Sequence, residues 1–125
     1  MKRKWYDIAD AEASALMRSL PPELRGKLGR VVITMSERPD EHEIMEEGDE
    51  DCLMGLFVGN TFAEESGGFG ETALPPEIRL FVGNILYETD GDEKEFRQEV
   101  RTTLLHEIGH YLGLDEDELE KRGLT

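Results

Sequence analysis

The stretch HEIGHYLGLDE, at residues 106–116, dominates the interpretation of this chain. An α-helix advances about 100° per residue, so His106 and His110, four positions apart, lie on the same face one turn apart. Two imidazoles on one face can both bind a zinc ion, at ~2.0–2.1 Å, when the chain supplies a third ligand and leaves one tetrahedral position for water. Glu107 would lie beside such a metal, where a general base belongs. The stretch therefore predicts a zinc site with its own base.

A third ligand is expected shortly after this helix ends. Gly113 is a residue type that can end a helix in the left-handed conformation without steric penalty, which turns the chain back toward the helix. Glu116 stands ten residues after His106, at the third-ligand position of the spacing H-E-x-x-H-x-x-G-x-x-H. A carboxylate oxygen is an acceptable zinc ligand, and Asp115 and Asp117 are the alternatives.

A purely structural interpretation of the same residues needs no metal. The two histidines would be exposed residues of an amphipathic helix, and the acidic run would be a solvated helix start. In particular, Asp115 can cap a last short helix, with Glu118 as its capping-box partner. Because two of the chain's three histidines fall inside the motif, we favour the metal interpretation.

The composition is that of a small acidic protein. At 125 residues we expect one domain, residues 1–125, with a modest core. The N-terminal segment has acidic residues where a signal peptide needs an apolar run, and no stretch approaches the ~20 apolar residues of a membrane span. The single cysteine, Cys52, excludes an internal disulfide and fits a reducing cytosol, so we predict a cytoplasmic protein without a membrane partner. A lone cysteine is more often a small buried hydrophobe than a zinc ligand.

The formal net charge of −15 bears on the choice of partner. Nucleic-acid phosphates would be repelled, which argues against DNA or RNA. The charge could favour basic peptides, although solubility alone is a sufficient reason for it. We therefore expect a peptide or protein substrate and no nucleic acid.

The apolar pattern predicts a mixture of helices and strands. Helices are expected over Tyr6–Leu20, over a short segment from Pro22 and over Glu93–Leu112, and strands over Arg30–Met35 (buried), Leu53–Gly59 and Ile78–Glu88. Ser36–Asp51, which contains His42, is expected to be an exposed acidic connection, and Thr61–Pro76 a flexible glycine-rich loop.

The pentapeptide Leu-Phe-Val-Gly-Asn occurs twice, at Leu56–Asn60 and at Leu80–Asn84. The glycine in each copy is expected at a bulge or turn where the strand changes course. The predicted helix Glu93–Leu112 has one broad apolar face with the motif histidines at its edge. Its metal side should therefore adjoin the core.

Three segments resemble a small bacterial family of zincin-like metallopeptidases: Leu53–Phe62, Leu74–Glu88 and Val100–Gly123. The resemblance implies an α+β, minimal zincin-like fold with an N-terminal helix, a small mixed sheet of three to four strands and a C-terminal active-site helix carrying HExxH. It also implies His106 and His110 as zinc ligands, Glu107 as the catalytic base and the acidic residue after the glycine as the third ligand. The family commonly has aspartate where this chain has Glu116.

The first functional hypothesis is a zinc-dependent metallopeptidase that hydrolyses peptide bonds by a zinc-activated water, with Glu107 as general base. Its metal ligands would be His106, His110 and Glu116. An extended peptide would pair with an edge strand, for which Ile78–Glu88 is the candidate.

The alternative is a zinc-binding regulatory or interaction module with little or no proteolytic activity, because a chain of this size leaves few residues to wall a substrate cleft. A third hypothesis is an acidic interaction domain without metal.

Overall fold

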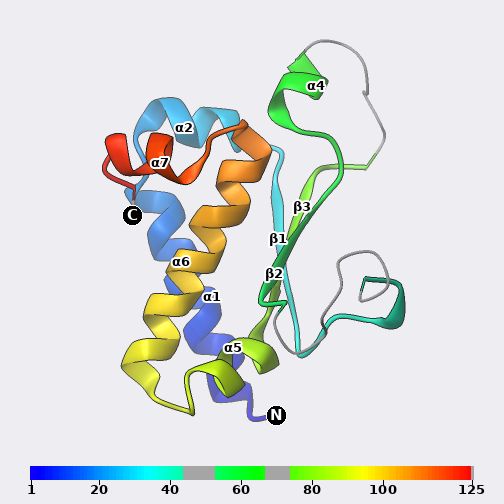
Figure 1. The fold of residues 1–125 in the computed structure, drawn as a ribbon, viewed down its shortest axis with the longest axis vertical. Coiled ribbons are helices and arrows are strands. Elements are labelled where there is room, and N and C mark those ends of the chain that lie inside the picture. Colours follow the sequence, from blue (N-terminus) through cyan, green and yellow to red (C-terminus); the bar gives the residue numbers. More distant parts are fainter. Residues whose placement is uncertain (44–52, 67–73, 125) are drawn as a thin grey trace.

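We describe the protein from a computed structural model, in which the described residues are 1–43, 53–66 and 74–124. Two long helices lie side by side, and the C-terminal one of the two packs on a three-stranded sheet (Figure 1). The elements with their bounds are α1 (Arg3–Ser19), α2 (Pro22–Lys27), β1 (Val32–Ser36), β2 (Gly55–Val58), α4 (Phe62–Ser66), β3 (Glu77–Phe81), α5 (Val82–Glu88), α6 (Glu93–Leu112) and α7 (Glu116–Lys121). This confirms the predicted α+β class, with a small mixed sheet and a C-terminal helix that carries the motif. None of the described helices is long and apolar enough to cross a membrane.

Helix α1 confirms the predicted N-terminal helix, although it begins earlier, at Arg3. Its apolar residues recur at helical spacing and pack against α6, where Trp5 meets Phe96 edge to face with ring centroids 4.9 Å apart. Pro21 and Pro22 follow its end, and Pro22 opens α2, as the sequence predicts, because proline is tolerated at the first helical position.

The sheet has the order β1-β3-β2, with β1 parallel and β2 antiparallel to the central strand β3. Ile78 and Leu80 of β3 are fully buried. The prediction of a strand near Arg30–Met35 is confirmed by β1, but the expectation that it is buried is wrong: Val32 is 42 % exposed because β1 is an edge strand. The strand predicted at Leu53–Gly59 is confirmed as β2.

The prediction of one strand over Ile78–Glu88 is wrong. Strand β3 ends at Phe81, and α5 begins at the next residue. Two contacts fix this change: the Gly83 amide donates to the Glu37 carbonyl at 2.8 Å, and the buried Asn84 side chain donates to the Leu53 carbonyl at 2.8 Å. A short apolar run does not distinguish a buried helix from a buried strand, and here tertiary contacts decide.

The predicted loop Thr61–Pro76 contains the short helix α4. Thr61 and Glu64 form reciprocal caps at its start: the Thr61 amide donates to Glu64 Oε1 at 2.9 Å, and the Glu64 amide donates to Thr61 Oγ1 at 3.3 Å. These are the bonds of a capping box, a signal visible in the sequence as Thr-x-x-Glu. Residues 67–73 lie outside the described part of the chain.

The acidic connection after β1 is only partly exposed in its described portion. His42 is exposed within a helical turn at residues 41–43, whereas Glu43 is 6 % exposed. Glu43 Oε2 accepts a bond from Arg79 Nη1 at 2.8 Å, which ties this turn to the central strand. Residues 44–52, and with them the predictions for Cys52, lie outside the described residues.

Helix α6 has the predicted bounds, Glu93 to Leu112. It begins because Asp92 Oδ1 accepts a bond from the Glu95 amide at 3.0 Å, and it ends at Gly113, whose φ of 72° is left-handed. Its buried apolar residues form one face against α1 and the sheet: Phe96, Val100, Leu104, Ile108 and Tyr111.

Candidate metal centre

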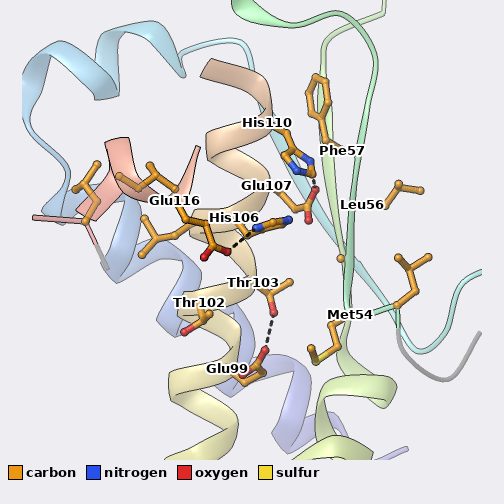
Figure 2. A pocket seen from close by; sticks show the side chains of 15 residues that line it. Met54, Leu56, Phe57, Glu99, Thr102, Thr103, His106, Glu107, His110 and Glu116 are labelled. Atoms are coloured by element: carbon orange, nitrogen blue, oxygen red, sulfur yellow. Dashed lines mark hydrogen bonds and ion pairs between the residues drawn. The ribbon is translucent and has the colours of Figure 1, made fainter. Parts of the chain in front are cut away.

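The motif residues lie in the last turns of α6, facing strand β2 (Figure 2). The side chains of His106 and His110 are 48 % and 54 % exposed, and their ring centroids lie 4.5 Å apart. Glu107 is only 5 % exposed, because its position on the helix turns it toward the sheet. The helix thus presents two accessible imidazoles beside one buried carboxylate.

The ligand-type atoms of these three side chains all lie within 4.8 Å of one another. His110 Nδ1 is 3.1 Å from Glu107 Oε1. Burial raises the pKa of Glu107, while the two imidazoles and a hydrogen bond from the Phe57 backbone amide act in the opposite direction. A buried carboxylate held by an imidazole and an amide is well placed to exchange a proton with the cleft.

The turn after α6 brings the acidic run back to the histidines. The Leu114 amide donates to the Gly109 carbonyl at 2.8 Å, which closes the turn. Helix α7 then starts with the predicted capping box: the Glu118 amide donates to Asp115 Oδ1 at 2.8 Å, and the Asp115 amide donates to Glu118 Oε1 at 3.3 Å. The structural role considered for Asp115 is therefore present.

Glu116 follows this cap and points back toward the motif. Its Oε1 is 3.5 Å from His106 Nδ1, and its side chain is 82 % exposed. Two donors bound to one tetrahedral zinc ion at ~2.0–2.1 Å lie about 3.3 Å apart, so this pair fits a shared metal. In the described part of the chain, the cluster of mutually close ligand-type atoms comprises His106, Glu107 and His110 and does not include Glu116. Among the described residues, Asp117 lines neither pocket at this site.

A cleft of about 680 Å³ lies between β2 and α6. Both motif histidines, Glu107 and Glu116 line it, together with the β2 backbone and apolar side chains from both walls. A second hollow of about 490 Å³ lies between α6 and α7 and shares the histidines and Glu116. The candidate ligands therefore stand where the two hollows meet.

The close approach of β2 to α6 depends on Gly55. A Cβ at this position would lie 2.6 Å from Thr103 Cγ2 and 3.4 Å from Glu107 Cγ. A side chain at this position would clash with the Thr103 methyl group, so glycine lets the strand pass this close to α6.

Two parts of the cleft differ from the sequence-based prediction. The prediction of Ile78–Glu88 as the substrate-binding edge is wrong, because β3 is the central strand and β2 forms the wall. Glu99 and Thr103, which were not predicted, line the same cleft. Their spacing to His106, seven and three residues, places them on one helical face, and this signal could have found them.

The donor set suits zinc, which binds imidazole nitrogen and carboxylate oxygen in tetrahedral sites. No curated protein matches the chain. A family model described as zincin-like metallopeptidase matches residues 28–124, a span that covers the whole sheet, α6 and α7. The chain therefore belongs to the zincin-like metallopeptidase family.

Proposed function

We propose that the protein is a zinc-dependent peptide hydrolase with Glu107 as its general base. The observation that carries the proposal is the buried Glu107 carboxylate, 5 % exposed, directly beside two accessible imidazoles on the wall of an open cleft. A buried carboxylate is costly unless it has a role or a partner, and this one adjoins the proposed metal ligands.

The outer edge of β2 supports an extended peptide as the substrate. The Phe81 amide donates to the Met54 carbonyl at 2.9 Å, and bonded pairs alternate along an antiparallel ladder. Gly55 and Phe57 therefore turn their backbone groups away from β3, at the edge of the sheet that lines the cleft. The Phe57 amide binds Glu107, which leaves the Gly55 groups and the Phe57 carbonyl for a peptide backbone.

The proposed chemistry divides between the ligands and the base. Zinc held by His106, His110 and Glu116 would supply a Lewis acid that polarises a peptide carbonyl and acidifies water. Glu107 accepts a proton from the attacking water and donates it to the leaving amine. Burial raises the pKa of Glu107, which favours acceptance of a proton by this carboxylate. The net charge of −15 supports a peptide over a nucleic acid as the partner.

The first test measures metal content by inductively coupled plasma mass spectrometry on untagged protein purified without chelator. We expect about one zinc per chain, lost in His106→Ala and retained in Glu107→Gln. Zinc-loaded wild type should cleave a quenched-fluorescence peptide library, and Glu107→Gln should be slower by about 100-fold or more. Turnover by Glu107→Gln at the wild-type rate would refute the base assignment, and absence of zinc after reconstitution would refute the proposal.

A matched pair of variants tests the assignment of the third ligand. Glu116→Ala should weaken zinc binding by about tenfold or more, whereas Asp117→Ala, which removes the next acidic side chain, should not. The reverse result would transfer the ligand role to Asp117.

One observation favours a second candidate, a zinc-binding regulatory or interaction module. Among the described residues that line the cleft there is no lysine, arginine or tyrosine side chain to stabilise an oxyanion. A protein that binds one zinc per chain but cleaves no member of the library would be this module.

A further inference from the structure

Glu99 lies at the far end of the cleft from His110. Glu99, Thr103, His106 and His110 follow one face of α6, and Figure 2 shows Glu99 beside Met54 at the start of the β2 wall. Glu99 and His106 are seven residues apart, which is about 10 Å along a helix.

The Glu99 carboxylate is only partly used by the protein. Its Oε1 accepts a bond from Thr103 Oγ1 at 3.3 Å, and Oε2 has no partner among the described residues. Glu99 is half-buried, and no lysine or arginine is found among the described residues that line the cleft. A half-buried anion without a cationic partner in an open cleft can bind a cation from the ligand.

We propose that Glu99 is a specificity-determining residue that binds a basic side chain, lysine or arginine, of the peptide substrate. This inference rests on the proposed function. An extended peptide advances about 3.3 Å per residue, so the 10 Å separation places the basic residue about three positions from the scissile bond.

The direction of the bound peptide follows from the direction of strand β2, which forms one wall of the cleft. Strand β2 runs from the Met54 end toward the Phe57 end, in the same sense as α6 runs from Glu99 to His110 (Figure 2). A peptide that pairs antiparallel with β2, the more stable arrangement, presents its C-terminal part to Glu99. The basic residue therefore lies on the C-terminal side of the bond.

The test uses zinc-loaded protein and two series of otherwise identical peptides, with lysine or norleucine scanned through three positions on each side of the cleaved bond. Wild type should prefer lysine by about tenfold in kcat/KM at the Glu99 position, mainly through KM. Glu99→Gln keeps an acceptor for Thr103 Oγ1 but removes the charge, so this variant should lose the preference for lysine. Its kcat/KM for the norleucine peptides should stay within about twofold of the wild-type value. Glu95→Gln, one turn earlier on α6 and outside the cleft, removes the same charge and should retain the preference.

Charge reversal sharpens the result. Glu99→Lys should prefer glutamate over lysine at that position, which a purely structural role for Glu99 would not produce. If no position shows a lysine preference that depends on Glu99, the inference is wrong although the hydrolase proposal stands.

A binding measurement distinguishes failure of the proposed hydrolase function from failure of the inference about Glu99. If wild type cleaves neither series, the proposed function fails, and fluorescence anisotropy of labelled peptides on zinc-loaded Glu107→Gln still tests Glu99. Tighter binding of lysine peptides that is lost in Glu99→Gln/Glu107→Gln would support the inference, and equal binding of both series would overturn it.

Discussion

The pentapeptide Leu-Phe-Val-Gly-Asn forms two different structures in this molecule. In Leu56–Asn60 it completes the edge strand β2 and then turns at Gly59, whose φ is 112°. In Leu80–Asn84 it completes the central strand β3 and passes directly into helix α5. The predicted turn is present at Gly59, whereas the prediction of a bulge or turn at Gly83 is wrong, because this glycine lies within α5.

The difference comes from the neighbours of each copy. Leu80 and Phe81 are fully buried at the end of the central strand, whereas Leu56 and Phe57 are half-buried and line the cleft. One copy therefore contributes to the core and the other to the site. Identical residues are fully buried where strands flank them on both sides and line the cleft where one side is open.

The largest expected contrast is between the two leucines. Leu80→Ala empties a fully buried position and should lower the free energy of unfolding by about 3 kcal/mol. Leu56→Ala should cost about 1 kcal/mol or less, because the residue is already partly exposed, and should instead weaken peptide cleavage. Urea unfolding of the metal-free proteins measures the loss of stability in both variants. Equal losses would contradict the division between a core copy and a site copy.

Alanine substitutions of Gly83 and Gly59, the glycines of the two copies, should destabilise the protein by different amounts and for different reasons. A Cβ at Gly83 would lie 2.5 Å from the Glu37 carbonyl oxygen, so Gly83→Ala should cost about 2 kcal/mol or more. Gly59→Ala places alanine at a φ of 112° and should cost about 1 kcal/mol. Adding Glu37→Ala should not rescue Gly83→Ala, because the nearest atom belongs to the backbone. A full rescue would show that the Glu37 side chain, 2.7 Å away at Cγ, causes the clash.

Gly55, the residue before the first copy, differs from Gly83 because its clash is with a side chain, which a second substitution can relieve. Gly55→Ala meets the Thr103 methyl group at 2.6 Å, a side-chain atom, and should cost about 1 to 2 kcal/mol. Thr103→Ser removes that methyl group and keeps the hydroxyl, so the double variant should recover most of the loss. The coupling energy from a double-mutant cycle, measured by urea unfolding, quantifies the contact. Additive effects would mean that β2 shifts away from α6 without cost.

Much of this fold could be predicted where local chemistry decides it. Helix α6 was predicted to the residue because an acidic cap precedes it and Gly113 ends it. The capping box of Asp115 and Glu118 was likewise visible in the sequence and is present. In each case the signal lies within a few residues of the element that it defines.

The rest depends on contacts between distant residues. Whether the run after Ile78 continues as a strand is decided by Glu37 and Leu53, which accept bonds from Gly83 and Asn84. The strand order is decided by packing, so the sequence could not show that β2 is the edge that faces the histidines. The assignment of Glu116 as a metal ligand stays a prediction, because its neighbour Asp115 caps α7 and shows that acidic residues here also have structural roles.

Tyr111 gives the smallest contrast; its ring packs on Phe57 of the first copy, with ring centroids 5.7 Å apart. Burial, with the bond from its hydroxyl to Glu65 Oε1 at 3.1 Å, raises the pKa of Tyr111 to about 12. Because this pKa lies above the unfolded value of about 10, the folded state holds the proton more tightly. The stability that results is fully present below pH ~10 and is lost as the pH rises toward about 12. Wild type should therefore exceed Tyr111→Phe by about 1 kcal/mol in free energy of unfolding at pH 8, and the gap should close toward higher pH. A gap that stays constant across this range would mean that the hydroxyl titrates alike in the folded and unfolded states.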